Sequence, residues 1–349
     1  MQDVRTVHLK FIIAFNHSEG IVHGIRDLAL GDEDPIIVTR KILVWTPSMS
    51  VRGKDKGLVD TVTRLAERCP VKCVVYERGN LDDQYADAVM FHVRTTKYED
   101  LPISRSPNQI YAALCIERPG HCSDIQTKLP KPYFNVSFGY LRNSRNYPFV
   151  YGEISRPDRG ETPMGMNDSE WKTFYAKKKH LAFVMISHCE TDSKRENYLE
   201  ALSQYANLTL IGGCYQRKCR EKECEKELAD SHFFYFAFEN TVCDDYVTEK
   251  FFARTRDKLV PVVLRRRILS GIAPDTAFVA ADDFTSPALL AEHLKTVAAN
   301  ETLFRSYFKW RDHFILRAHE SEFSNKLNFD ITMAGPTDFC ESNAALNLL

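Results

Sequence analysis

The sequence predicts an α/β protein with two domains, each built on a parallel sheet that is covered by helices. Short apolar runs rich in β-branched and aromatic residues recur along the chain, and the segments between them are long enough for helices. A polar stretch rich in Pro and Gly separates the runs into two sets. The length of 349 residues also favours two domains. We therefore expect two sheets, with one cleft between the domains.

Each half of the chain supplies one set of predicted strands. The first set is HLKFIIAF at 8–15, KILVWT at 41–46, CVVYE at 73–77, AVMFHV at 88–93 and IYAALCIE at 110–117. The second set is HLAFVMIS at 180–187, LTLIGG at 208–213, HFFYFAF at 232–238, VPVVL at 260–264 and FVAADDF at 278–284. Strands that alternate with helical segments are typical of parallel sheets buried on both faces. After the last strand, Ser286 followed by Pro287 predicts the start of C-terminal helices.

The charge balance excludes a broad attraction to nucleic acid or to an acidic membrane surface. Lys and Arg number 46 against 47 Asp and Glu, which gives a formal net charge of −1. The run from Arg265 to Arg267 is therefore interpreted as a local anion contact or a solvated loop. No stretch approaches the ~20 apolar residues that a membrane span needs.

Cysteines and glycosylation sequons together favour the lumen of the secretory pathway. The chain has ten cysteines and five N-x-S/T sequons, which begin at Asn16, Asn135, Asn167, Asn207 and Asn300. Cys214, Cys219 and Cys224, with Cys189 or Cys243, raise the alternative of a zinc site. Their spacings of five residues differ from the tight C-x₂-C pairs of zinc sites, so disulfides are favoured.

The segment FFYFAFENTVCDDYVTEKFF at 233–252 is the candidate ligand site, because it runs from a strand through a loop into a helix. In open α/β sheets, ligands bind at the carboxyl ends of strands, next to the amides that begin the following helix. Asp244 or Asp245 is the predicted cap of that helix. Tyr246, Glu249, Lys250 and Ala253 then share one face. A Lys ammonium and helix-terminal amides suit a diphosphate, and a carboxylate suits sugar hydroxyls.

The motifs FAFEN at 236–240, DDYVTEKFF at 244–252 and VPVVL at 260–264 resemble the signature of the α1,3/α1,4-fucosyltransferases, glycosyltransferase family 10. The segment from His180 to Cys214 resembles the first strand, phosphate loop and helix of the family's donor domain. IYAALCIERPGHC at 110–122, YFNVSFGY at 133–140 and FVYG at 149–152 resemble its acceptor domain. The similarity runs from Lys41 to about Phe314, and an invertebrate member is one candidate.

This resemblance implies a GT-B architecture, in which two Rossmann-like domains face each other across a cleft. The expected division is an acceptor-binding domain at 1–155, a linker at 156–179, a GDP-fucose-binding domain at 180–325 and a tail at 326–349. The expected reaction is inverting α1,3-transfer of L-fucose from GDP-β-L-fucose to a GlcNAc hydroxyl. The acceptor is a glycoprotein or glycolipid oligosaccharide, either the N-glycan core or an outer arm of LacNAc or LacdiNAc type.

The resemblance also assigns roles to single residues. Glu117 is the expected general base, because it matches the position of the family's catalytic carboxylate and ends a strand. Arg195 and Lys250 are expected to stabilise the GDP leaving group. The remaining donor contacts expected are Glu239, Asn240, Tyr246 and Glu249, and Glu239 could instead tie the strand to the helix. His121 is a candidate acceptor contact or alternative base.

No essential metal or other cofactor is expected, because positive side chains can neutralise the diphosphate; a divalent cation such as manganese would at most stimulate. Asp244 with Asp245 and Asp282 with Asp283 are interpreted as caps and turns rather than metal ligands. The family is expected in the Golgi lumen as type II membrane proteins. This chain would be the soluble catalytic region, attached to the membrane only through an anchor absent from this sequence.

Two departures from the common vertebrate pattern bear on the acceptor. RRRILSG at 265–271 replaces a Gly and a later Tyr-Glu pair, and LRNSRNY at 141–147 replaces an Asp-Ser-Asp segment. Two other hypotheses stay open at this point. One is a GT-B glycosyltransferase that uses a different nucleotide sugar, and the other is a glycan-binding homologue without catalysis.

Overall fold

The computed structural model describes residues 39–46, 57–67, 72–118, 125, 128–130, 132–141, 147–148, 151–219, 222–318 and 340–341. The chain divides into two compact units, which we call unit 1 (residues 1–149 with 325–336) and unit 2 (150–324 with 337–349). The strand predicted at 8–15, the sequon at Asn16 and the candidate His121 lie outside the described residues. The cleft and the four predicted domain ranges stay predictions.

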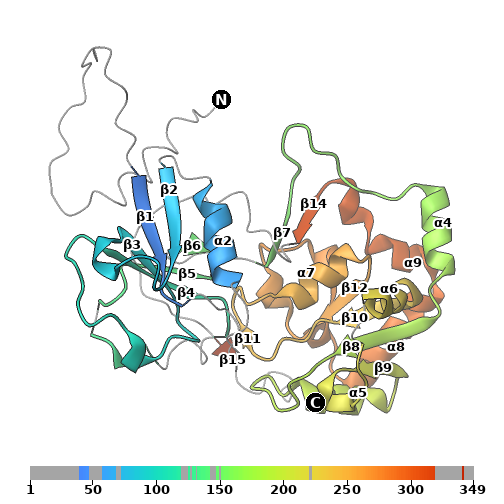
Figure 1. Ribbon diagram of the computed structural model, residues 1–349. Coiled ribbons are helices and arrows are strands. Elements are labelled where there is room, and N and C mark those ends of the chain that lie inside the picture. The colour runs from blue at the N-terminus through green and yellow to red at the C-terminus, as the bar shows by residue number, and fades with distance from the viewer. Residues whose placement is uncertain are drawn as a thin grey trace. The chain divides into compact units, whose positions relative to one another are not determined.

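Unit 1 contains a six-stranded parallel sheet with the order β2-β1-β3-β4-β5-β6 (Figure 1). The strands are β1 (Thr39–Val44), β2 (Lys72–Glu77), β3 (Ala88–His92), β4 (Ile110–Cys115), β5 (Val136–Gly139) and β6 (Tyr147–Pro148). Helix α2 (Gly57–Ala66) packs beside β1 and β2. Successive residues of β1 serve opposite faces, since Leu43 packs with Phe91 while Val44 packs with Leu58. The four predicted strands that lie within the described residues all form.

Unit 2 contains a five-stranded parallel sheet with the order β13-β12-β10-β8-β9. Its strands are β8 (His180–Met185), β9 (Leu208–Ile211), β10 (His232–Phe236), β12 (Val260–Val263) and β13 (Val279–Ala280). Unit 2 also contains two separate antiparallel pairs: β7 (Gly152–Ser155) with β14 (Ile315–Ala318), and β11 (Val242–Cys243) with β15 (Cys340–Glu341). All five strands predicted for this half are therefore confirmed.

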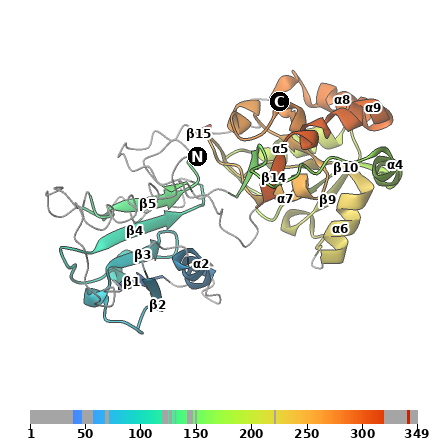
Figure 2. The ribbon, with the colours of Figure 1, turned by 90° about the horizontal axis from the view of Figure 1, so that it is seen from above.

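Helices cover both faces of the unit 2 sheet. Figure 2 shows α5 (Arg195–Ser203), α8 (Pro287–Ala299) and α9 (Glu301–Ser306) on one side, and α6 (Lys222–Ser231) and α7 (Glu249–Arg256) on the other. Strands β8, β10 and β12 consist mostly of buried apolar residues, as expected for a sheet covered on both faces. Gly212, which follows β9 at φ 115°, permits close approach to β8, because a Cβ there would lie 1.9 Å from the carbonyl oxygen of Ile186.

The stretch at 156–179, expected to be a linker, contains helix α4 (Asp168–Ala176). Asn167 begins this helix with a capping box that it forms with Glu170. Trp171 is 1% exposed and packs against Phe174, Phe304 and Phe308. The second half of the stretch is thus part of the core of unit 2, because its aromatic residues are spaced to bury one helical face.

The C-terminal helices begin where the sequence predicts. The Ser286 side chain accepts a hydrogen bond from the backbone N–H of Leu289, and Pro287 occupies the first turn of α8. Asn300 ends α8, and its side chain caps α9 by accepting a hydrogen bond from the N–H of Leu303 at 3.0 Å.

Candidate functional site

The candidate site of unit 2 lies at the carboxyl ends of β8 and β10, which are neighbours in the sheet. The chain leaves β8 for β9 on one side and leaves β10 for β12 on the other, so the strand order reverses between them. Such a switch point opens a crevice that binds ligands in doubly wound folds. Asp192, Ser193 and Arg195 follow β8, and Glu239 and Asn240 follow β10.

Glu239, Thr248 and Lys250 form a compact charged cluster at this edge. Glu239 is 3% exposed, and its Oε1 accepts hydrogen bonds from the Thr248 N–H at 2.9 Å and from its Oγ1 at 2.7 Å. The Lys250 Nζ lies 3.1 Å from Glu239 Oε2 and 3.0 Å from Thr248 Oγ1. It also lies 3.1 Å from Glu249 Oε1, whose side chain is 53% exposed. Glu239 therefore ties the end of β10 to the start of the following helix, which is the structural role given above as the alternative to a donor contact.

The cluster keeps Lys250 charged. Burial lowers the pKa of Lys250, but the carboxylates of Glu239 and Glu249 outweigh that effect, and the net shift is upward. Burial raises the pKa of Glu249, but the Lys250 ammonium and the hydrogen bonds to the carboxylate together lower it by more. The result is a fixed ammonium that is still 22% exposed at the start of a helix, where an anion is favoured.

The loop of residues 187–194, called here the donor loop, is hydrogen bonded together with Arg195 to the end of β10. The backbone carbonyl oxygens of Phe238, Glu239 and Asn240 accept these hydrogen bonds. Arg195 Nη1 donates to the Phe238 oxygen at 2.5 Å. Ser193 donates twice, from Oγ to the Glu239 oxygen at 2.7 Å and from its N–H to the Asn240 oxygen at 3.0 Å. The two strand ends on either side of the crevice are thus held in one arrangement.

Arg195 itself is buried at 2% exposure. Burial lowers the pKa of its guanidinium, and the nearby Glu239 carboxylate partly offsets this. Its Nε has no hydrogen-bond partner among the described residues, and neither has the buried Oδ1 of Asn240. Two buried polar atoms without partners at one edge are uncommon in proteins and point to a place where a ligand completes the bonding.

The predicted start of the following helix is wrong. Thr248, rather than Asp244 or Asp245, caps α7, which begins at Glu249. Asp245 adopts a left-handed φ of 61°, and the N–H of Val247 donates to its carbonyl oxygen, so residues before Thr248 form a turn. Tyr246 lies in this turn and is 2% exposed. It therefore does not share a helix face with Glu249 and Lys250.

The paired aspartates and the arginine run contact each other. Asp283 binds the Arg266 guanidinium, Asp282 accepts the Arg266 N–H at 2.9 Å, and Asp244 pairs with Arg267. Each of these aspartates has an arginine partner, so neither the paired aspartates nor the arginine run needs a metal or an anion to explain it. Within the described ranges, no group of three or more His, Cys, Asp or Glu residues is placed to hold a metal ion.

In unit 1, Glu117 follows β4 and Arg94 follows the neighbouring β3. The two side chains form an ion pair, and the Glu117 side chain is 28% exposed. Because parallel strands end at the same edge of a sheet, this pair lies at the carboxyl edge, where ligands bind.

Disulfides replace the alternative zinc cluster. Cys189 is bonded to Cys214 and Cys219 to Cys224. The first of these bonds links the donor loop to the turn after β9. Cys73, Cys115 and Cys243 are disulfide-bonded as well.

The four sequon asparagines within the described residues are exposed: Asn135, Asn167, Asn207 and Asn300. Asn167 and Asn300 cap helices through Oδ1, and the Oδ1 of Asn135 accepts the Tyr111 N–H at 2.7 Å. Glycans attach to the amide nitrogen, so these hydrogen bonds are compatible with modification.

Three residues of the site were missed at the level of sequence: Thr248, Ser193 and Arg94. Thr248 carried a signal, because a Thr directly before EKFF is a good helix cap. Arg94 could have been found from parallel pairing, since it follows its strand as Glu117 follows the next. Ser193 carried no local signal, because its partner is a backbone carbonyl 46 residues away.

Both units have Rossmann-like parallel sheets, and unit 2 carries a charged cluster at its switch point, which is the plan of the GT-B class of glycosyltransferases. The sequence matches the pattern of "Fucosyltransferase, N-terminal" over residues 38–151 and that of "Glycosyltransferase family 10 (fucosyltransferase) C-term" over residues 175–347. The chain belongs to glycosyltransferase family 10, which confirms the family and the enzyme class predicted from sequence.

Alpha-(1,3)-fucosyltransferase C of Drosophila melanogaster is 31% identical over 330 residues, which are 83% of this chain and 76% of that protein. Glycoprotein 3-alpha-L-fucosyltransferase A of Drosophila melanogaster is 36% identical over 256 residues, and the match covers 71% of this chain but about half (48%) of that protein. A crystal structure of an alpha1,3-fucosyltransferase with GDP-fucose has a TM-score of 0.52 at 15% identity and covers 81% of this chain and 84% of its own. This likeness confirms the α/β, GT-B fold.

Proposed function

We propose that the chain transfers L-fucose from GDP-β-L-fucose to a GlcNAc hydroxyl of a glycan, forming an α1,3 linkage with inversion. The observation that carries the proposal is the Glu239–Thr248–Lys250 cluster at the switch point of unit 2 in a chain of this family. The ammonium at the start of α7 and the amides of its first turn suit the diphosphate of the donor.

The leaving group needs positive charge that is already in place. Lys250 supplies it directly, because its ammonium is accessible and the two neighbouring carboxylates keep it protonated. Arg195 is the second proposed cation; it acts from beneath the donor loop, where its field is weakly screened by solvent. Asn240, Tyr246 and Glu249 are proposed to contact the nucleoside and the sugar, with Glu249 as an acceptor for hydroxyls.

Glu117 is the proposed base. In the transfer step, Glu117 takes the proton of the acceptor hydroxyl, the acceptor oxygen bonds to C1 of fucose, and the bond from C1 to the β-phosphate oxygen breaks to release GDP. A single displacement of this kind inverts the configuration at C1. Arg94 would hold the Glu117 carboxylate at the strand end.

No metal or other cofactor has a necessary part in this step, since Lys250 and Arg195 supply the positive charge. We expect activity to persist in EDTA, with at most stimulation by Mn²⁺. Complete loss of turnover in EDTA that Mn²⁺ restores would contradict this part of the proposal.

The proposed acceptors are the N-glycan core and outer arms of LacNAc or LacdiNAc type, on glycoproteins or glycolipids. The Golgi lumen is the proposed location, which the disulfide-bonded cysteines and the four exposed sequon asparagines support. Among the described residues, no helix has both the length and the apolar character to cross a bilayer.

The test is incubation of the purified protein with GDP-fucose, GDP-mannose and UDP-sugars at matched concentration, together with a panel of defined glycans. We expect turnover with GDP-fucose and an α1,3-linked fucose in the product, identified by NMR. Turnover with GDP-mannose or a UDP-sugar and none with GDP-fucose would assign a different donor. Glycan binding without turnover of any donor would instead indicate an inactive binding homologue.

The base assignment has its own test. Glu117→Gln keeps the shape of the side chain but removes its basicity, so kcat should fall about 10²–10⁴-fold. The Kd for GDP should stay unchanged, because the base does not contact the leaving group. Full transfer activity of Glu117→Gln would show that another residue is the base.

A further inference from the structure

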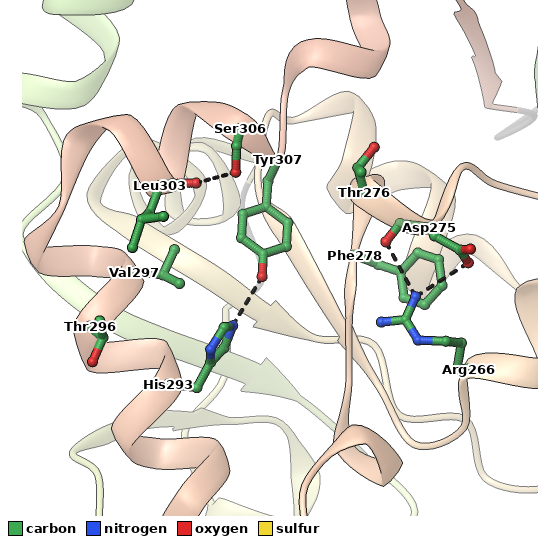
Figure 3. A pocket seen from close by; sticks show the side chains of 10 residues that line it. All are labelled: Arg266, Asp275, Thr276, Phe278, His293, Thr296, Val297, Leu303, Ser306 and Tyr307. Carbon is green, nitrogen blue, oxygen red and sulfur yellow. Dashed lines mark hydrogen bonds and ion pairs between the residues drawn. The ribbon is translucent and has the colours of Figure 1, made fainter.

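A pocket in unit 2 is lined by residues that have no role in the proposed reaction. It has a volume of about 280 Å³ and is lined by the end of α8, by α9 and by the segments around Arg266 and Asp275. Figure 3 shows the side chains of α8 and α9 on one side, and Arg266 with Asp275 on the other. The volume is close to the lower end of the ~300–1,000 Å³ range of small-ligand sites, so it suits a ligand of monosaccharide size.

The charged groups at the pocket give it no net positive charge. The Arg266 guanidinium donates to Asp283 through Nε at 2.9 Å and also through Nη2 at 2.5 Å, and its Nη1 lies 3.3 Å from Asp275 Oδ1. Burial lowers the pKa of His293, although Asp283 opposes this, so its imidazole is neutral at neutral pH. A cation held between two carboxylates attracts an anion weakly unless helix amides add to the attraction, as those of α7 do beside Lys250. No α-helix has its first residue among the lining residues of this pocket, so a neutral ligand is favoured over phosphate or sulfate.

The polar groups that face the pocket are rich in hydrogen-bond acceptors. The Thr296 hydroxyl donates to the Glu292 carbonyl oxygen at 2.9 Å, and the Ser306 hydroxyl donates to that of Leu303 at 2.6 Å. Each hydroxyl oxygen then retains lone pairs for a ligand. The Asp275 side chain is 83% exposed and adds a carboxylate. A neutral ligand with several hydroxyl donors satisfies such a set.

Apolar surface lies between these acceptors. Val297 and the 42% exposed Leu303 line the α8 and α9 side, and Tyr307 holds its phenol oxygen 3.0 Å from His293 Nε2. Sugars present both hydroxyls and C–H faces, so mixed lining of this kind matches them better than it matches a purely polar or purely apolar molecule.

We propose that this pocket, between Asp275 and the helices α8 and α9, is a binding site for a neutral saccharide unit that is separate from the donor site. None of its lining residues belongs to the charged cluster at Lys250 or to the donor loop. A site here would retain a glycan chain on the enzyme independently of the chemistry at the switch point.

The test measures saturation-transfer NMR from the protein to the methyl glycosides of N-acetylglucosamine, galactose and mannose. Thr296→Trp places a large ring in the pocket, and Lys295→Trp is the matched control on the neighbouring exposed position of the same helix. We expect transfer to at least one glycoside, lowered at least fivefold in Thr296→Trp and unchanged in Lys295→Trp. Both variants should bind GDP like the unaltered protein.

A milder variant guards against misfolding of the first. Asp275→Ala alters an exposed side chain and should weaken the same signal several-fold. The proposal is overturned if no glycoside receives saturation, or if the signal is the same in Thr296→Trp, Asp275→Ala and the unaltered protein, because the sugar then binds elsewhere. Displacement of the glycoside by inorganic phosphate would also overturn it, since that outcome identifies an anion site.

Discussion

A lysine in low-dielectric surroundings lies at each end of the unit 2 sheet, and the pKa values of the two lysines shift in opposite directions. At the carboxyl end, the carboxylates of Glu239 and Glu249 raise the pKa of Lys250. At the amino end, burial lowers the pKa of Lys178 to about 7, while its Nζ donates to the Ala229 carbonyl oxygen at 2.6 Å and lies over the Phe174 ring.

A histidine at the amino end follows the same pattern. Burial lowers the pKa of His232 to about 4, although the Leu228 carbonyl oxygen opposes this. The difference between the two ends shows where a positive charge serves the ligand site. At the carboxyl end, neighbouring carboxylates keep the lysine protonated. At the amino end, burial favours the neutral forms of the lysine and the histidine.

The largest expected effect is a loss of activity on substitution of Lys250, the lysine at the carboxyl end. Lys250→Met should lower kcat/KM for GDP-fucose about 10³-fold, because it removes the accessible cation beside the leaving group. The exposed Lys295→Met is the control and should be neutral.

Loss of Lys250 also strands the buried Glu239 carboxylate, which costs about 3–5 kcal/mol of unfolding free energy. The double variant Glu239→Gln/Lys250→Met should recover much of that stability in denaturant titrations without recovering activity. Recovery of both would mean that Lys250 acts through folding alone.

The reverse outcome is expected for Lys178→Met, which should raise the unfolding free energy by up to about 5 kcal/mol at pH 6, the equivalent of the pKa difference between 10.5 and about 7, and leave transfer unchanged. The unfolded chain binds the extra proton between the folded pKa of about 7 and the unfolded value of 10.5, so native stability rises with pH across that window. The gain from Met should therefore be largest below pH 7 and vanish above 10.5. Lys177→Met, at a 55% exposed neighbour, should show no such pH dependence.

A smaller effect is expected at Thr248, which joins Glu239 and Lys250 through one hydroxyl. Thr248→Val should lower kcat/KM about tenfold and the unfolding free energy by about 1 kcal/mol, because the cap of α7 is also lost. Thr248→Ser retains the hydroxyl and should restore most of both. If Val and Ser variants behave alike in GDP binding, Thr248 does not position the ammonium.

The smallest effect is expected in the donor loop. Ser193→Ala removes the hydrogen bond to the Glu239 carbonyl oxygen and leaves the one from its N–H to Asn240, so we expect a three- to fivefold rise in the Kd for GDP, about 1 kcal/mol. Ser203→Ala, which removes a similar bond within α5, is the matched control. Equal changes in both variants would show that the donor loop does not depend on this contact.

The strands of both units could be predicted from sequence, because fully buried parallel strands are continuous apolar runs such as HFFYFAF at 232–238. The start of α7 could not, since two aspartates before an apolar run look like better caps than Thr248 until the left-handed Asp245 and its turn are known. Helix α4 was overlooked because its stretch begins with Pro and Gly, although Trp171, Phe174 and Tyr175 have helical spacing.

The site residues divide in the same way. The charged residues of the strand-to-helix segment could be found from their position and their resemblance to the family. Contacts to backbone carbonyls, such as those of Ser193 and Arg195, depend on which strands become neighbours, and local sequence carries no trace of that pairing.

Because a disulfide bond joins Cys189 to Cys214, the measured activity should depend on the redox conditions in which the protein was produced and stored. Material produced in a reducing cytoplasm, or stored with excess thiol, would carry a donor loop released from the turn after β9. A weak preparation of that kind says little about the native catalyst. Expression through an oxidising compartment, checked by a free-thiol assay before kinetics, keeps the two situations apart.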